Sequence, residues 1–157
     1  MYHTILLAYD GTREGRLALR EGARLAQICG SRVVLMAVLD PSIGVNLAAS
    51  SGGAYVPMFE IGDYQKILDE GVERLIRMGL TPDARLETGQ PAERITAIAK
   101  EVAADLVVVG HHKQGLMARW LRGSVTTSLT DSLECSLLVA QLEITDEVLF
   151  AKPTTTV

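Results

Sequence analysis

The chain has 157 residues, enough for one compact domain with a hydrophobic core and too few for two domains of ordinary size. Hydrophobic residues make up 48% and charged residues 22%, which excludes a disordered chain, and no apolar run approaches the roughly 20 residues that span a bilayer. The net charge of −4 argues against a general affinity for nucleic acid, whose phosphates require a basic surface.

The N-terminal residues, MYHTILLAYDGT, predict a cytoplasmic location. They contain an acidic side chain by position 10, no basic leader and no small-residue cleavage site. Cys29 and Cys135 lack CxxC and metal-finger spacing, and in a reducing compartment such cysteines usually pack as small hydrophobes. We therefore interpret both as core residues rather than redox groups.

Strand and helix patterns alternate through the first part of the chain. The run from Thr4 to Tyr9 is apolar or β-favouring throughout and predicts a strand buried on both faces. Helical spacing begins near Arg13, with Gly30 as a C-terminal cap, and a second buried strand spans 32–39. From Asp40 to Gly62 the pattern breaks into Pro, Gly, Ser and Ala, which predicts a long loop.

The second part continues the alternation. Helical periodicity runs from Tyr64 to a stop at Gly79, and residues 84–88 alternate like a short strand. Pro91 occupies the favoured first-turn position of another helix. Its expected buried stripe is Ile95, Ile98, Ala99 and Val102.

The clearest buried strand is 106–109, which Gly110 ends abruptly. Helical spacing returns at 116–122 and 125–133, before a last apolar run at 137–140. This order predicts an open, doubly wound α/β fold of the Rossmann-like kind, with five parallel strands and helices on both faces. We assign residues 1–141 to this domain and residues 142–157, which lack clear periodicity, to a C-terminal tail.

Ligands of doubly wound sheets bind beyond the carboxyl ends of strands, where the strand order reverses. That rule nominates the turns after Tyr9, Leu39, Thr88 and Val109. The turn after Val109 is the strongest candidate. It lies in the stretch 106–130, which contains no Asp or Glu. The same stretch carries His111, His112, Lys113, Arg119 and Arg122. A local positive field on an acidic protein indicates a small anion as ligand.

The candidate phosphate-binding residues combine glycines with hydroxyl and amide donors. Glycine allows close backbone approach and positive φ, and amides at a helix start direct their dipoles at an anion. Each residue taken singly could instead turn the chain or cap a helix. Adjacent histidines seldom converge on one metal ion, so we prefer the phosphate interpretation to a metal site. The candidates are Gly110, His112, Lys113, Gln114, Gly115, Gly123, Ser124, Val125 and Thr126.

The spacing of these glycines carries a specific resemblance. Gly110, two residues, position 113, nine residues and then Gly123-Ser124 resemble the nucleotide motif of the universal stress protein family, except that the second motif glycine is Lys113 here. The opening ILLAYDGT resembles that family's first strand and acidic turn. The segment VVLMAVLD, residues 33–40, resembles its second strand, whose end typically holds adenine by backbone hydrogen bonds. The likeness covers residues 2–141.

The resemblance implies an adenine-nucleotide site. Residues 8–10 (Ala8, Tyr9 and Asp10) and Val38 would surround the base and ribose, with Val109 packing nearby. Residues 110–115 and 124–126 would take the phosphates. ATP or another adenine nucleotide, alone or with Mg²⁺, is the ligand that the resemblance implies.

Three functions remain in competition. The leading hypothesis is a stress-response or signalling protein that binds ATP or a related adenine nucleotide with little or no hydrolysis, because no general base for water is evident. A nucleotide-independent dimeric interaction protein of the same fold is the alternative that Lys113 favours. An adenylylating or ATP-cleaving enzyme is disfavoured, because no complete pyrophosphatase loop is present. No catalytic residue or metal ligand is assigned.

Two further expectations concern assembly and Asp10. The last strand, Leu137 to Gln141, is apolar and closes the sheet, and an uncovered edge invites pairing, so we expect a homodimer there, as in members of the family that the chain resembles. A regulatory protein partner is expected but not identifiable. Asp10 follows the first strand, where it could accept from a ribose hydroxyl or place Mg²⁺; the alternative is that it caps the following helix.

Overall fold

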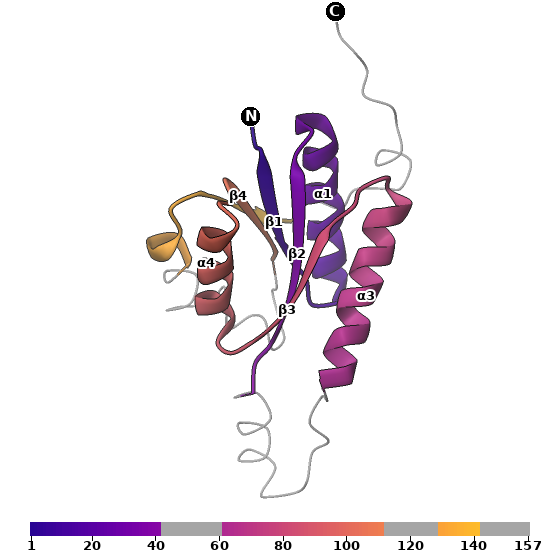
Figure 1. Ribbon diagram of the computed structural model, residues 1–157, viewed down its shortest axis with the longest axis vertical. Helices are drawn as coiled ribbons and strands as arrows, with labels where there is room; N and C mark the ends of the chain where they lie inside the picture. Colours follow the sequence, from indigo (N-terminus) through magenta and orange to yellow (C-terminus); the bar gives the residue numbers. More distant parts are fainter. Residues whose placement is uncertain (42–60, 112–128, 142–157) are drawn as a thin grey trace, which may run out of the picture.

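A computed structural model describes residues 1–41, 61–111 and 129–141 (Figure 1). Its strands are β1 (Thr4–Ala8), β2 (Arg32–Leu39), β3 (Asp83–Thr88), β4 (Leu106–Gly110) and β5 (Ser136–Ala140). Its helices are α1 (Arg13–Cys29), α3 (Ile61–Arg77) and α4 (Pro91–Glu101). All strand pairs are parallel, in the order β3-β2-β1-β4-β5. The predicted five-stranded parallel sheet is confirmed.

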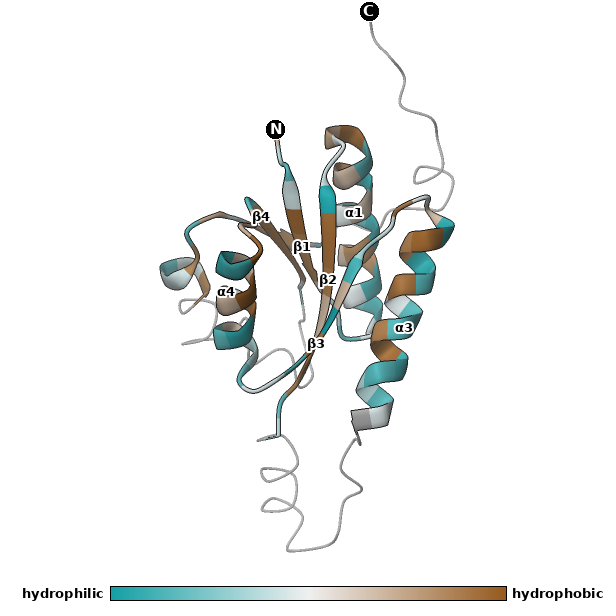
Figure 2. Ribbon diagram, in the orientation of Figure 1, coloured by the Kyte–Doolittle hydropathy of each residue, from teal (hydrophilic) through white to brown (hydrophobic). Residues whose placement is uncertain are grey.

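Helices cover both faces of the sheet, as predicted. Helices α1 and α3 lie on one face, and α4 lies on the other together with a helical turn at 129–132 (Figure 1). In β1, Ile5 and Leu7 pack toward α1 and α3, whereas Leu6 packs toward α4. Figure 2 shows the consequence, with β1, β2 and β4 coloured mainly hydrophobic, β3 mixed and the helices banded. A strand buried on both faces has no polar face, which explains its unbroken apolar run.

Local signals fix the helix ends. Thr12 is the N-cap of α1 and its side chain accepts a hydrogen bond from the amide of Gly15. Gly30 takes the predicted left-handed cap conformation, with φ of 65°, and its N–H donates to Ala26. Pro91 lies in the first turn of α4, as expected. The expected stripe on and just after that helix is buried: Ile95, Ile98, Ala99 and Val102.

Several predicted boundaries need correction. Helix α3 begins at Ile61, so the predicted loop does not extend to Gly62. Strand β4 includes Gly110, which pairs with Ala140 of β5 instead of ending the strand. Strand β1 ends at Ala8, although the amide of Tyr9 still donates to the carbonyl of Met36 at 2.8 Å. The expected helix at 116–122 and the tail at 142–157 lie outside the described residues.

The strand order reverses between β1 and β4. The chain moves outward from β1 to β2 and β3 and then crosses by α4 to β4 on the other side of β1. Leu7 of β1 lies beside Leu35 of β2 and Val108 of β4, so the carboxyl ends of these three central strands reach the same edge. This edge is where a doubly wound sheet binds its ligand. In the described ranges, no helix is long and apolar enough to cross a membrane.

Candidate functional site

The turn between β1 and α1 is held by hydrogen bonds that start at Asp10. The Asp10 Oδ1 atom accepts from the backbone amide of Thr12 at 3.0 Å and from its hydroxyl at 2.7 Å. The Thr12 Oγ1 atom in turn accepts from the amide of Gly15 at 3.0 Å. The N-cap of α1 is therefore Thr12, and the alternative in which Asp10 caps the helix is wrong. Asp10 instead orients the cap through an Asx turn.

Two glycines allow α1 to begin close to this edge. A Cβ atom on Gly15 would lie 2.1 Å from Asp10 Oδ1, so the carboxylate occupies the space that a larger residue would fill. A Cβ atom on Gly110 would lie 2.8 Å from the backbone C and O of Glu14 and 3.0 Å from the Gly15 nitrogen. Gly110 does not have a positive φ. In the described structure, its missing side chain admits the first turn of α1, so the expectation that a loop glycine here serves positive φ is corrected.

Three predicted apolar residues come together on the α4 side of this edge. Ala8 is the last residue of β1, and Val38 and Val109 are the residues before the last in β2 and β4; all three lie on the face that packs toward α4. Val38 and Val109 are buried, while Ala8, which pairs with Met36 two residues before Val38, is only partly covered. A small, partly covered residue near two branched ones is suited to the flat face of an apolar ring.

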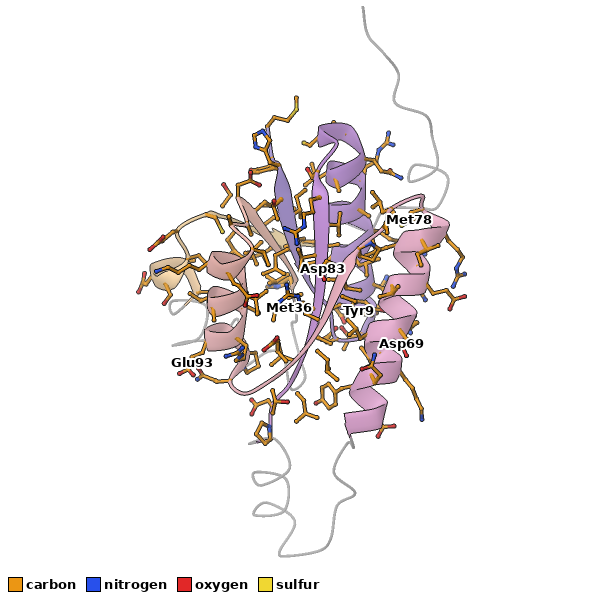
Figure 3. The ribbon with its side chains drawn as sticks, in the orientation of Figure 1. Tyr9, Met36, Asp69, Met78, Asp83 and Glu93 are labelled. Carbon is orange, nitrogen blue, oxygen red and sulfur yellow. The ribbon has the colours of Figure 1, made fainter. Side chains whose placement is uncertain are left out.

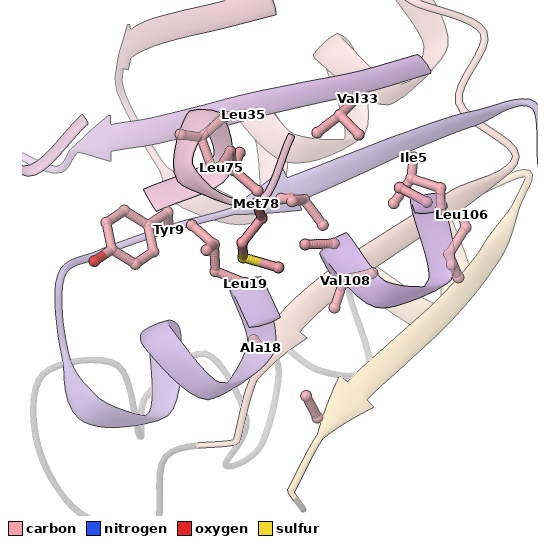
Figure 4. Close-up of a cluster of buried hydrophobic side chains, with 14 of the residues drawn as sticks. Ile5, Tyr9, Ala18, Leu19, Val33, Leu35, Leu75, Met78, Leu106 and Val108 are labelled. Atoms are coloured by element: carbon pink, nitrogen blue, oxygen red, sulfur yellow. The ribbon is translucent and has the colours of Figure 1, made fainter. Parts of the chain in front are cut away.

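Tyr9 faces the opposite side of the sheet. Its ring is buried at the end of the cluster that α1 and α3 cover, with the hydroxyl turned away from the buried leucines (Figure 4). The hydroxyl donates to Oε2 of Glu70 on α3. Figure 3 shows Tyr9 beside this helix. Burial, followed by this bond to Glu70, raises the pKa of Tyr9 to about 12. The side chain of Tyr9 is therefore separated by the sheet from Ala8, Val38 and Val109.

The edge is electrostatically uneven. Burial raises the pKa of Tyr64 on α3, and the negative charges of Asp40 and Asp10 raise it further. Asp40 and Asp10, which follow β2 and β1, therefore both lie near Tyr64. These negative charges disfavour an anionic ligand group near the ends of β1 and β2. Such a group is better placed near the end of β4, at Gly110 and His111.

The described residues contain only part of the predicted site. Ala8, Asp10, Val38, Val109 and Gly110 meet at one edge of the sheet. Tyr9 lies on the opposite face of the sheet. The remaining predicted residues lie outside the described ranges: His112, Lys113, Gln114, Gly115, Gly123, Ser124, Val125 and Thr126. Within the described ranges, no group of three or more His, Cys, Asp or Glu side chains could hold a metal ion.

Sequence reasoning missed the residues that shape the turn. Thr12 is a signal that could have been read, because Ser or Thr just before a helix is a favoured cap. The partner of Tyr9 carries no such signal. Glu70 lies on another helix, so only the fold brings it to the end of β1.

The two cysteines lie away from this site and are free thiols, each half-buried rather than in the core. Burial and then the charge of Asp105 raise the pKa of Cys135, which keeps its thiol protonated. Cys135 lines a hollow of about 380 Å³ between the C-terminal half of α4 and residues 132–135. This hollow shares no residue with the predicted site.

Comparisons with known proteins agree with the fold. The model of the universal stress protein family matches residues 1–141. A universal stress protein of Thermus aquaticus is 29% identical over 145 residues, covering 90% of this chain and 100% of that protein. A solved universal stress protein in complex with cAMP superposes with a TM-score of 0.64 at 22% identity, covering 89% of this chain and 97% of that chain.

A second solved structure is that of the universal stress protein from Archaeoglobus fulgidus in complex with dAMP. It has a TM-score of 0.64 at 20% identity and covers 89% of this chain and 98% of that chain. Because the two solved structures are only 22% and 20% identical to this chain, they establish the fold alone. The family is established by the family model, which matches residues 1–141. The chain therefore belongs to the universal stress protein family.

Proposed function

We propose that this protein binds an adenine nucleotide at the edge of the sheet between β1 and β4, with little or no hydrolysis. The observation that carries the proposal is the grouping of Ala8, Val38 and Val109 on one face beside the Asp10 turn. Its family membership and the cAMP and dAMP complexes of similar proteins support the choice of an adenine nucleotide.

Each part of the nucleotide has a proposed partner. The base lies against Ala8 between Val38 and Val109, and its edge bonds to backbone groups at the end of β2. Asp10, whose Oδ1 atom is held by the two bonds from Thr12, is proposed to accept from a ribose hydroxyl, because a carboxylate has lone pairs for several donors. The phosphates extend toward β4, away from the carboxylates of Asp10 and Asp40.

The remaining roles rest on sequence chemistry. Residues 110–115 and 123–126 are proposed to bind the phosphates through backbone amides and hydroxyl groups. Lys113 replaces a motif glycine and contributes a mobile point charge instead of a backbone cradle. ATP is the proposed nucleotide, and Mg²⁺ would accompany its phosphates without a described protein site. The proposed context is a cytoplasmic stress-response or signalling role with a regulatory protein partner.

A nucleotide panel tests the proposal. Thermal unfolding and calorimetric titration with ATP, AMP, cAMP and dAMP are expected to show stabilisation by at least one of them, because a ligand at 100 times its Kd stabilises the folded state by about 2.7 kcal/mol. Ala8→Leu should abolish this effect by filling the face for the base. Ala84→Leu, on the exposed surface of β3, is the matched control and should bind as the native protein does.

The opposite result would favour the alternative function. If no adenine nucleotide binds at millimolar concentration, the chain is a nucleotide-independent interaction protein. Titrating Lys113→Gly at low and high salt separates two causes of weak binding. If Lys113→Gly binds the nucleotide far more tightly than the native protein at both salt concentrations, Lys113 blocks the site. If Lys113 contacts the phosphates as a point charge, nucleotide binding by the native protein weakens at high salt.

A homodimer through β5 is proposed as the assembly. The strand is the last in the sheet, and Leu137, Leu138 and Val139 are only partly buried by the chain itself. A parallel edge strand with partly covered apolar residues favours pairing with a second copy.

A further inference from the structure

One carboxylate on α3 contacts both flanks of the Asp10 turn. Oε2 of Glu70 accepts from the hydroxyl of Tyr9, the residue before Asp10. Oε1 of Glu70 lies 3.1 Å from both Nε and Nη2 of Arg16, in the first turn of α1. The same oxygen accepts from Nε of Arg74, one turn along α3, at 2.6 Å. We call these four residues the Glu70 brace.

The two residues that Glu70 contacts outside α3 flank the hydrogen-bonded turn. Between Tyr9 and Arg16 lie the bonds from Thr12 to Asp10 and from Gly15 to Thr12. Fixing residues 9 and 16 to one carboxylate therefore fixes the distance between the end of β1 and the start of α1. That distance determines where the Asp10 carboxylate and the first amides of α1 lie.

Packing makes the brace stiff. The ring of Tyr9 is buried, and a Cβ atom on Gly71 would lie 2.8 Å from its Cδ1, so α3 lies against the ring with no space left. Burial alone would raise the pKa of Glu70, but bonds from Tyr9 and Arg74 and the charges of Arg74 and Arg16 outweigh it and lower the pKa. Glu70 is therefore held as a carboxylate, and its charged hydrogen bonds are stronger than neutral ones.

A second ion pair on α3 provides a comparison. Glu73 lies 3.3 Å from Arg77 with both side chains well exposed, at 69% and 64%. Such a pair contributes little to stability and is screened by salt. Glu70, by contrast, is partly buried and joins three elements.

We infer that Glu70 is a positioning residue for the nucleotide site, acting through Tyr9 and Arg16 on the Asp10 turn. The inference rests on the proposed function for its ligand, but the local order of the turn can be measured without any ligand. By linkage, a nucleotide that requires this geometry stabilises the brace as much as the brace strengthens its binding.

The test uses Glu70→Gln and Tyr9→Phe in the full chain, with Glu73→Gln as the matched control. Backbone hydrogen exchange of the ligand-free protein is measured by NMR. The amides of Thr12 and Gly15 are expected to exchange about tenfold faster in both brace variants, relative to amides in the centre of β4. Affinity for the best nucleotide of the panel should fall about tenfold. Combining both substitutions should add little to Glu70→Gln alone, because the residues act together.

Several outcomes decide the inference. It is overturned if the Thr12 and Gly15 amides keep their native exchange in Tyr9→Phe, or if Glu73→Gln accelerates them equally. It is also overturned if nucleotide affinity is unchanged while only global stability falls, since that result describes a structural contact. If Glu70→Gln does not fold, Tyr9→Phe keeps the ring and carries the same test. A native protein that binds no nucleotide contradicts the proposed function, while the exchange result still decides whether Glu70 orders the turn.

Discussion

Gly110 stands where two backbones meet. It belongs to β4 and its Cα faces the first turn of α1, at Glu14 and Gly15. Because the neighbouring atoms are backbone, they cannot move aside as the end of a flexible side chain would. The first glycine of the family motif therefore has a packing role in this chain, whatever a ligand requires of it.

Gly110→Ala is expected to destabilise the protein by about 1–3 kcal/mol, the usual cost of overpacking a close contact. Gly62→Ala is the control, because a Cβ atom there meets nothing within 4 Å and its φ is not positive. In a helix that change should be neutral or stabilising by up to about 1 kcal/mol. Urea unfolding measures both. Equal stability of Gly110→Ala and the native protein would show that α1 can move away without cost.

The residues of the site were predictable to different degrees. Asp10 follows from the strand-end rule, because parallel strands bring their carboxyl ends to one edge. Ala8, Val38 and Val109 were implied by the family resemblance. The direction of Tyr9 does not follow, because alternation along a strand places neighbours on opposite faces without saying which face the ligand takes. Its partner Glu70 is set by tertiary packing alone.

The edge element β5 has two distinct sides. The amide of Ser136 donates to the carbonyl of Asp105, and the carbonyl of Ala140 accepts from the amide of His111. In a parallel ladder these end bonds direct the backbone groups of 136, 138 and 140 toward β4. The backbone groups of Leu137 and Val139 therefore face the open edge.

A pair of proline variants tests pairing at that edge. Val139→Pro removes an amide that faces outward, so it should disrupt the proposed dimer while leaving the β4 ladder intact. Leu138→Pro removes an amide of the ladder itself and should lower stability by about 3 kcal/mol or more. Light scattering and thermal unfolding follow the two effects. A native monomer at micromolar concentration, or a Val139→Pro dimer as strong as the native one, would contradict assembly through β5.

The elements were largely predictable because their patterns are strong. Strands β1, β2 and β4 are buried on both faces and have unbroken apolar runs. Errors arose where the local signal opposes the structure. Gly62 lies in the first turn of α3, although glycine weakens a helix, and Gly110 continues a strand, although glycine commonly ends one.

At the scale of the whole molecule, the brace couples stability to alkaline pH. The pKa of Tyr9 is about 12 in the folded protein, above the ordinary value of 10.0. The folded state therefore keeps a proton that the unfolded state releases first. The contribution of Tyr9 to the free energy of unfolding is therefore fully present below pH 10. It is lost as the pH rises through 12.

Urea unfolding between pH 8 and 12 should show this loss. The native protein is expected to lose stability faster than Tyr9→Phe above pH 10, by at most roughly 2–3 kcal/mol, because each pKa unit corresponds to about 1.4 kcal/mol. Absorbance of the tyrosinate ion gives a second measurement, since the component that titrates near pH 12 should be missing from Tyr9→Phe. Parallel loss of stability in both proteins would mean that the hydroxyl of Tyr9 ionises equally in both states.

The central place of β1 governs the time at which the sheet can be completed. Ile5 pairs with Val33 early in the chain, but with Leu106 only about two thirds of the way along it. During synthesis, β1, α1 and β2 leave the ribosome long before β4 and can pair at once. The edge of β1 that pairs with β4 stays unpaired, and its apolar residues stay exposed, until β4 has been synthesised. Folding that depends on such a distant pairing is slow, and the unpaired edge is where a nascent chain is most prone to aggregate.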